Sequence, residues 1–198
     1  FSGGGARDEG ERDDFTQIAA AEPTLQEALI RQLQLTAMSE RDKRLALLVI
    51  AHLDGDGYLT ASLDELHETG IEEIADLDKD EVLIALRQVQ NLEPAGVGAR
   101  DLAECLVLQL RALDPATPHR DCAIDLVCHH LDALATRDFN KLRRSLGVDE
   151  DELREVRALI LRLDPKPGRA WSEGKLITLT YGYEQATRHR RPPASGPS

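Results

Sequence analysis

The chain has 198 residues, of which 41% are hydrophobic and only 4% aromatic, and its formal net charge is −12 at pH 7. Such a chain can bury one or two small cores, and a core poor in aromatic residues must use leucine, alanine, valine and isoleucine, which favours helices over a β-sandwich. The charge is uneven, because residues 1–22 carry a net −4 and residues 166–198 a net +4. The body, residues 23–165, is therefore strongly acidic, which argues against unaided binding to nucleic acid.

The cysteines and the apolar runs point to a protein of the reducing cytoplasm. Cys105, Cys122 and Cys128 show no paired spacing and lie beside apolar residues in helical patterns, so we expect buried free thiols. The longest uninterrupted apolar run, Leu45–Ala51, is too short to span a bilayer, and no secretory signal is visible. The sequence predicts a cytoplasmic protein with no membrane partner and, because it does not begin with Met, a fragment.

The first half of the chain predicts a helical module over residues 23–114, preceded by a disordered acidic linker at 1–22 that shows no hydrophobic periodicity. Four helix starts are marked by a Ser, Thr or Asp, three of them followed three residues later by a capping Glu. These starts are Thr24, Ser39, Ser62 and Asp78. A fifth helix places leucines on one face, at Leu102, Leu106, Leu110 and Leu113.

Prolines at 115 and 118 interrupt the pattern and predict a boundary, followed by a second helical module over residues 118–165. We expect one helix over 119–135, a short one that starts at Asp138, and a long one after Asp149 that ends before Pro165. Residues 166–198 read as an extended or disordered tail, with a strand-like alternation at Leu176–Tyr183. The predicted fold class is all-α, with two small helical bundles joined by a Pro-containing connection and flexible termini.

The stretch HLDGDGYLTASLDEL at residues 52–66 is similar to a calcium-binding loop. An EF-hand loop needs oxygen ligands at positions 1, 3, 5 and 12 and glycine at position 6. Neither register supplies them all: with Gly57 at position 6, Leu63 falls where the last carboxylate is required. We favour a helix–turn–helix corner, and a calcium-responsive helical regulator is one alternative. The carboxylates on which it rests are Asp54, Asp56 and Glu65.

The unit at residues 139–163, with Gly147 between two helices, has the layout of a helix-turn-helix. A DNA reader carries Arg, Lys, Asn or Gln on the first turns of its second helix, but residues 149–152 are all acidic. Basic residues on the preceding helix could touch a DNA backbone without reading bases. These residues are Lys141, Arg143 and Arg144. A DNA-binding helix-turn-helix regulator is the second alternative.

No motif in the sequence predicts catalysis. Cys122 and His129 share a helix face, but structural zinc sites have tighter paired spacing and four ligands, so we expect packed thiols and no metal. The sequence has no nucleophile elbow, phosphate loop or metalloprotease motif. We therefore expect a binding module that needs no cofactor, rather than an enzyme.

The most specific stretch is NLEPAGVGARDLAECLVLQL at residues 91–110, where Pro94, Gly96 and Gly98 punctuate a turn between two amphipathic helices. Glycine can adopt a positive φ and proline cannot continue a helix, so this spacing predicts a sharp, closely packed turn. A side chain at Gly96 would clash or force an unfavourable φ. We expect Gly96→Val to lower both stability and the affinity for a partner.

Three pieces of the chain resemble the core-binding region of sigma-54, the bacterial transcription initiation factor family, and the resemblance extends from about Leu25 to Trp171. The pieces are LDGDGYLT at 53–60, LEPAGVGARDLAECL at 92–106 and LDPKPGRAW at 163–171. The resemblance implies an all-helical region that binds the β and β′ subunits of core RNA polymerase and forms a holoenzyme that stays closed until an ATP-driven activator remodels it. The family's N-terminal activator-contact segment and its C-terminal basic motif for promoter DNA find no match here, so we expect both partners to act through regions absent from this sequence.

The resemblance and the turn chemistry together imply a set of residues that contact core polymerase or shape the surface that does. They are Asp54, Asp56, Gly57, Tyr58, Glu93, Pro94, Gly96, Gly98, Arg100 and Asp101. Asp101 also lies where it favours the positive end of the following helix dipole, so a capping role is weighed equally with direct contact.

Overall fold

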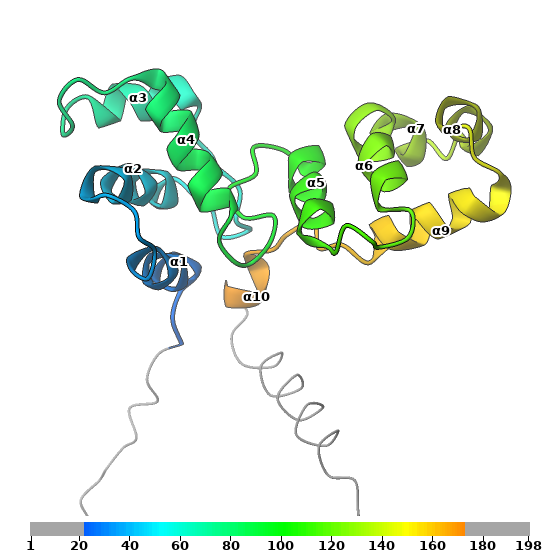
Figure 1. The fold of residues 1–198 in the computed structure, drawn as a ribbon, viewed down its shortest axis with the longest axis horizontal. Helices are drawn as coiled ribbons and strands as arrows, with labels where there is room; N and C mark the ends of the chain where they lie inside the picture. The colour runs from blue at the N-terminus through cyan, green and yellow to red at the C-terminus, as the bar shows by residue number, and fades with distance from the viewer. Residues whose placement is uncertain (1–21, 173–198) are drawn as a thin grey trace, which may run out of the picture.

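The computed structural model describes residues 22–172, and over this range the chain is all-α, with ten helices and no strand (Figure 1). The helices are α1 (Leu25–Gln34), α2 (Glu40–Ala51), α3 (Leu63–Gly70), α4 (Lys79–Gln90), α5 (Leu102–Ala112), α6 (Arg120–His129), α7 (Leu131–Ala135), α8 (Phe139–Leu146), α9 (Glu150–Leu161) and α10 (Arg169–Ser172). Among them, none is long and apolar enough to cross a bilayer. The acidic linker at 1–21 and the strand-like stretch at 176–183 lie outside the described residues.

The helix starts follow the expected caps. Thr24, Ser62 and Asp78 each form a capping box with the Glu three residues later, as Asp149 does with Glu152. The side chains of Ser39 and Asp138 accept a hydrogen bond from a first-turn amide of α2 and α8. These local bonds satisfy backbone donors that a helix start leaves free, and therefore fix where the helices begin.

The buried side chains form two separate clusters, and the helices that contribute to them lie on opposite sides of the molecule in Figure 1. Helices α1–α4 bury the first cluster, which runs from Leu25 to Val97, and α5–α9 bury the second, from Leu106 to Ile160. Leu106 and Leu110 of α5 thus belong to the second cluster, because α5 packs against α6. The division between the two clusters falls before α5, whereas the sequence predicts a boundary at Pro115. A first module that ends at residue 114 therefore stays a prediction.

The second half differs from the sequence-based expectation in three places. The single helix expected over 119–135 breaks at His130, whose backbone is not helical, and the break turns α7 toward α8 and buries Ala133. Cys105 is buried as expected, but Cys122 is only partly buried and Cys128 is exposed; all three are free thiols. Residues 169–172 form the short helix α10 where an extended or disordered tail was expected, and residues 173–198 lie outside the described range.

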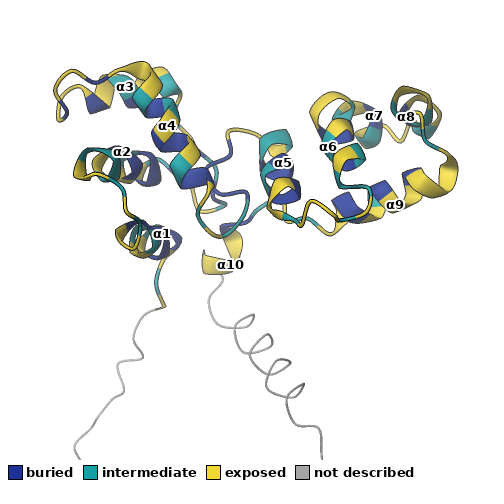
Figure 2. Cartoon of the chain, in the orientation of Figure 1, coloured by how far each residue is buried: buried dark blue, intermediate teal, exposed yellow. Residues whose placement is uncertain are grey.

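The segment between α4 and α5 is irregular yet buried, as the dark blue of the connection in Figure 2 shows. Residues 96–99 are all buried, and the side chains of Val97 and Ala99 have no exposed surface. A buried segment outside a helix must find hydrogen-bond partners for its peptide groups elsewhere. Partners for Gly98 and Ala99 come from the irregular segment after α2 and from the Gln90 side chain, which makes this region the candidate site.

Candidate functional site

Three irregular segments meet between the two hydrophobic clusters. They are residues 54–58 after α2, residues 94–101 between α4 and α5, and residues 164–169 after α9, and we call them the corner, the turn and the proline segment. Backbone hydrogen bonds join the corner to both other segments. The three together are called the junction.

Asp54 builds the corner through its own carboxylate. One of its oxygens accepts hydrogen bonds from the amides of Asp56 at 2.9 Å and Tyr58 at 3.0 Å, and its amide donates to the Tyr58 carbonyl at 2.9 Å. Gly57 closes the loop with φ +93°, a conformation that favours glycine. The carboxylate of Asp54 therefore serves the backbone of its own loop.

The turn lies on the corner through backbone contacts. The Gly98 amide donates to the Gly57 carbonyl at 2.8 Å, and the Leu59 amide donates to the Ala99 carbonyl at 2.9 Å. The buried side chain of Gln90, at the end of α4, donates to the Gly98 carbonyl at 3.0 Å. The first cluster is thus hydrogen-bonded to the turn from two sides.

The side chains of Gln109 and Tyr58 hold the proline segment in place. Buried Gln109 of α5 accepts from the Asp164 amide at 2.7 Å and donates to the Asp164 carbonyl. The hydroxyl of Tyr58 donates to the Pro165 carbonyl at 2.6 Å, and burial raises the pKa of this phenol. Tyr58 lies on the corner, beside the first cluster, and Gln109 lies on α5, which belongs to the second. These bonds therefore connect the two clusters.

Gly168 brings the backbone of the proline segment into direct contact with the corner. Its amide donates to the Asp56 carbonyl at 2.9 Å. A Cβ at Gly168 would lie 2.6 Å from the Gly57 nitrogen and 2.7 Å from the Gly55 oxygen. These are backbone atoms that no side-chain rotation can move away, so only glycine fits here. Lys166 and Arg169 add ion pairs to Asp56 at 3.5 and 3.6 Å.

Gly96 meets the constraint that the sequence predicts for it. Its φ is +96°, and a Cβ there would lie 2.8 Å from Gln109 Nε2 and 2.9 Å from the sulfur of Cys105. Cys105 lies against the same segment, with its sulfur 3.7 Å from the Asp164 carbonyl oxygen, and burial raises the pKa of this thiol. A side chain at position 96 would displace the residues that hold the proline segment.

Glu104 anchors the end of the turn at the start of α5. Its carboxylate accepts from the Arg100 guanidinium at 2.8 and 2.9 Å and from the Arg100 amide at 2.8 Å, and Arg87 adds an ion pair at 3.3 Å. Burial by itself would raise the pKa of Glu104, but the bonds from Arg100 outweigh burial and lower it to about 2. Asp101 caps the helix by accepting from the Glu104 amide at 2.8 Å.

The structure brings together most of the residues singled out in the sequence. Asp54, Asp56, Gly57, Tyr58, Gly96 and Gly98 have their hydrogen bonds or close contacts within the junction. Glu93 and Arg100 are exposed, and the Gln32 side chain of α1 holds the Glu93 backbone with bonds of 2.6 and 2.8 Å. Pro94 follows a cis peptide bond. Lys141, Arg143 and Arg144 lie apart from the junction, on α8.

The residues of the calcium alternative do not converge. Asp54 binds its own loop, Asp56 pairs with Lys166 and Arg169, and Glu65 completes the capping box of Ser62. Within residues 22–172, no three Asp, Glu, His or Cys side chains are placed to hold a metal ion together. Each carboxylate has a structural partner instead.

Sequence reasoning missed the three glutamines and the glycine that complete the junction. Gln90 and Gln109 are polar residues on the buried faces of apolar helices, and such a break in an apolar pattern is a readable signal. Gln32 and Gly168 gave no such signal, because their partners lie far away in the chain. The Gln32–Glu93 bond spans 61 residues.

The fold and the junction define the class of this protein: over residues 22–172 it is all-helical, with two clusters joined by hydrogen-bonded loops. The family model "Sigma-54 factor, core binding domain" matches residues 14–180. The chain is 44% identical to the RNA polymerase sigma-54 factor of Pseudomonas aeruginosa over 155 residues, which cover 78% of this chain and 31% of that protein. The factor of Salmonella typhimurium is 39% identical over 165 residues, 82% of this chain and 34% of that protein. The factor of Escherichia coli is 40% identical over 153 residues, 77% and 31% of the two chains.

The chain therefore belongs to the sigma-54 factor family. It spans about a third of the length of the curated relatives it matches. The three pieces that carry the resemblance in the sequence contain the corner, the turn and the proline segment.

Gly168→Ala tests the contact between the proline segment and the corner. The added Cβ has to push backbone apart, so we expect a loss of about 2 kcal/mol of stability and a melting temperature roughly 4–8 °C lower. Gly55→Ala is the matched control, because a Cβ at Gly55 has no atom within 4 Å. Thermal unfolding followed by circular dichroism measures both, and equal melting temperatures for the two variants would contradict the packing described here.

Glu104→Gln tests the charge at the end of the turn. A carboxylate whose folded pKa is about 2, against an ordinary 4.5, contributes stability above pH 4.5 and loses that contribution as the pH falls toward 2. We expect the variant to be less stable at pH 7 by on the order of 2 kcal/mol, and the difference to shrink toward zero near pH 2. Urea unfolding across this pH range measures it; Glu40→Gln, whose side chain is 88% exposed, should change little. A difference that does not depend on pH would contradict the role given to the Glu104 charge.

Proposed function

We propose that this chain is the part of an RNA polymerase sigma-54 factor that binds core RNA polymerase. In that role it supports the holoenzyme that starts transcription under the control of an activator. The observation that carries the proposal is the junction, since the three sequence pieces most similar to the family pack against one another in it. A junction of this kind gives the helices one fixed arrangement, and a fixed surface lowers the entropic cost of binding a partner.

The junction residues are proposed to act in two ways. The first group makes its hydrogen bonds or close contacts inside the junction and thereby shapes the surface. It consists of Asp54, Gly57 and Tyr58 of the corner and Gly96 and Gly98 of the turn. Asp56 and Asp101 also have structural partners, as an ion pair and as a helix cap. The side chain of Glu93, next to Pro94, is exposed and available for direct contact. Arg100 is also exposed, and it would make contact while its guanidinium stays bound to Glu104.

The contact surface itself is proposed to lie on the first cluster, over α3, the loop after it and the start of α4. Residues 62–84 carry nine carboxylates and one lysine, and Ile71 and Ile84 in this range are 51% and 54% exposed. An acidic surface with exposed apolar side chains suits a partner that is basic around an apolar centre. We infer that this partner surface belongs to the β and β′ subunits of the core enzyme.

The wider activity of the factor is proposed to depend on regions outside this sequence. Promoter DNA and the ATP-driven activator would be contacted by those regions, while this chain acts as a subunit of DNA-directed RNA polymerase without chemistry of its own. Its place would be the bacterial cytoplasm, at the nucleoid through the polymerase.

Co-elution of the 198-residue chain with purified core RNA polymerase on a sizing column, repeated at rising salt, tests the proposal. We expect a complex at low salt that weakens as salt screens the acidic surface. Glu72→Gln with Glu73→Gln removes two exposed charges from that surface and should lower the salt concentration at which the complex dissociates.

The matched control is Asp132→Asn with Glu155→Gln, which removes two exposed carboxylates from α7 and α9, the helices around the second cluster. This pair should leave the complex unchanged. A folded wild-type chain that never co-elutes would contradict core binding. Equal effects of the two pairs would contradict the placement of the surface over α3 and α4.

A further inference from the structure

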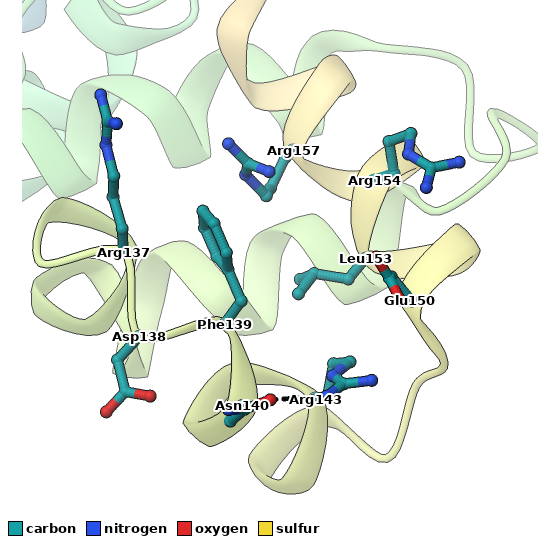
Figure 3. A pocket seen from close by; sticks show the side chains of 9 residues that line it. All are labelled: Arg137, Asp138, Phe139, Asn140, Arg143, Glu150, Leu153, Arg154 and Arg157. Atoms are coloured by element: carbon teal, nitrogen blue, oxygen red, sulfur yellow. Dashed lines mark hydrogen bonds between the residues drawn. The ribbon is translucent and has the colours of Figure 1, made fainter.

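The second cluster has a cavity walled by arginines at the meeting of α8 and α9 (Figure 3). Its volume is about 410 Å³, and four of its nine lining residues are arginines, from the loop before α8, from α8 and from α9. The lining residues are Arg137, Asp138, Phe139, Asn140, Arg143, Glu150, Leu153, Arg154 and Arg157. An arginine-rich wall is unexpected in a chain with a net charge of −12.

Most of these arginines have no carboxylate partner within the described residues. Arg154 pairs with Asp151 at 2.9 Å. Arg143 instead donates to the side-chain oxygen of Asn140 at 2.6 Å, and Arg157 lies over the ring of Phe139, 4.1 Å from its centre. The Nε of Arg157 is buried and has no hydrogen-bond partner there. The wall is therefore positively charged, with four arginines against the two carboxylates of the lining.

The two carboxylates of the cavity lower its net charge but form no ion pair with these arginines. Asp138 accepts from the Lys141 amide at 3.1 Å as the cap of α8, which leaves Glu150 as the other acidic group of the lining. Figure 3 shows Phe139 between the side chains of Arg137, which comes from the loop before α8, and Arg157, which comes from α9. The cavity thus holds one guanidinium group, that of Arg157, over an aromatic ring, and the other arginines lie along its walls.

A second cavity of about 490 Å³ continues the positive surface across α8. It is lined by Asn140, Arg143, Arg144 and Val148, and it shares Asn140 and Arg143 with the first. Two adjoining cavities with guanidinium groups along them fit a chain of anions better than a single anion. The planar guanidinium group also matches the oxygens of phosphate in a two-point hydrogen bond.

We propose that these two cavities form a binding site for the phosphate backbone of nucleic acid, with Arg137, Arg143 and Arg144 as the contacts. The site follows the backbone without reading bases, because the first turn of α9 carries Glu150, Asp151 and Glu152. It differs from the sequence-based set in one respect: Arg143 and Arg144 line the cavities, whereas Lys141 lines neither of the two.

The site lies in the second cluster, apart from the acidic surface proposed for polymerase. The remaining charge of the body repels nucleic acid, so the affinity of the isolated chain should be at the weak end of non-specific binding, with a dissociation constant of about 10⁻⁴ M at physiological salt and a lower one at low salt. Within a larger assembly that already holds DNA, such a site would fix the path of the backbone rather than select a sequence.

Fluorescence anisotropy of a fluorescein-labelled DNA duplex of about 20 base pairs tests the site with the whole 198-residue chain. Arg137→Gln with Arg143→Gln removes two contacts, so the plot of log affinity against log salt should become shallower by about 1.8. At a salt concentration of about 20 mM the affinity should fall roughly tenfold or more. Both side chains reach the surface, and circular dichroism checks that the variant folds.

Arg31→Gln with Arg44→Gln is the matched control, since it removes two exposed arginines from the first cluster and changes the net charge equally. The arginines at 188, 190 and 191 remain in every variant, so they cancel from the comparison. The control pair should leave the salt dependence unchanged. Equal slopes for the two pairs overturn the proposal, as does unchanged affinity in the cavity variant.

A polyglutamate peptide separates nucleic acid from an acidic protein segment. Binding of the peptide that is tighter than that of the duplex, and that is lost in the cavity variant, would overturn the proposal in favour of a protein ligand. The cavity variant should still co-elute with core polymerase. Loss of DNA affinity with intact co-elution therefore supports this site independently of the polymerase proposal. If the wild-type chain fails to co-elute but the cavity variant still loses DNA affinity, the polymerase proposal is contradicted and the DNA site is supported.

Discussion

The arrangement of this protein depends on how the peptide groups of three irregular loops, each with at least one buried residue, are hydrogen-bonded. A buried peptide group without a partner is costly, and these loops have no helix or sheet to supply one. The corner, the turn and the proline segment supply partners to one another, and the side chains of Gln32, Gln90 and Gln109 complete the set. Because Gly168 lies directly on the backbone of Gly57, these bonds form only when both helical clusters are in place.

The sequence alone predicted the features that depend on residues close together in the chain. Helix starts such as Thr24 and Asp149 were confirmed, because a capping box is made within four residues. The break at His130 and the packing of α5 with the second cluster were missed, because tertiary packing decides both. In the site, the spacing of the turn predicted that position 96 requires glycine. The same requirement at position 168 appears only in the structure, where residues 56 and 168 lie side by side.

The two clusters divide the charge of the protein between them. The first carries a dense acidic surface over residues 62–84, and the second holds guanidinium groups in adjoining cavities on α8. Net charge alone hides this division, since the body of the chain is acidic as a whole. A module that meets a basic protein surface with one cluster and a phosphate backbone with the other would hold both at a geometry set by the junction. That is the structural advantage of joining the clusters through hydrogen-bonded loops rather than through a flexible linker.

The central claim is that the junction is as stable as the helical cores it connects. Native-state hydrogen exchange by NMR tests it through three loop amides that bond across the junction, those of Leu59, Gly98 and Asp164. The account predicts that they exchange within about tenfold of the buried helical amides of Leu86 and Leu126, because all five would open only on global unfolding. Fast exchange of the loop amides beside protected helices would contradict it, and would mean that the two clusters move independently.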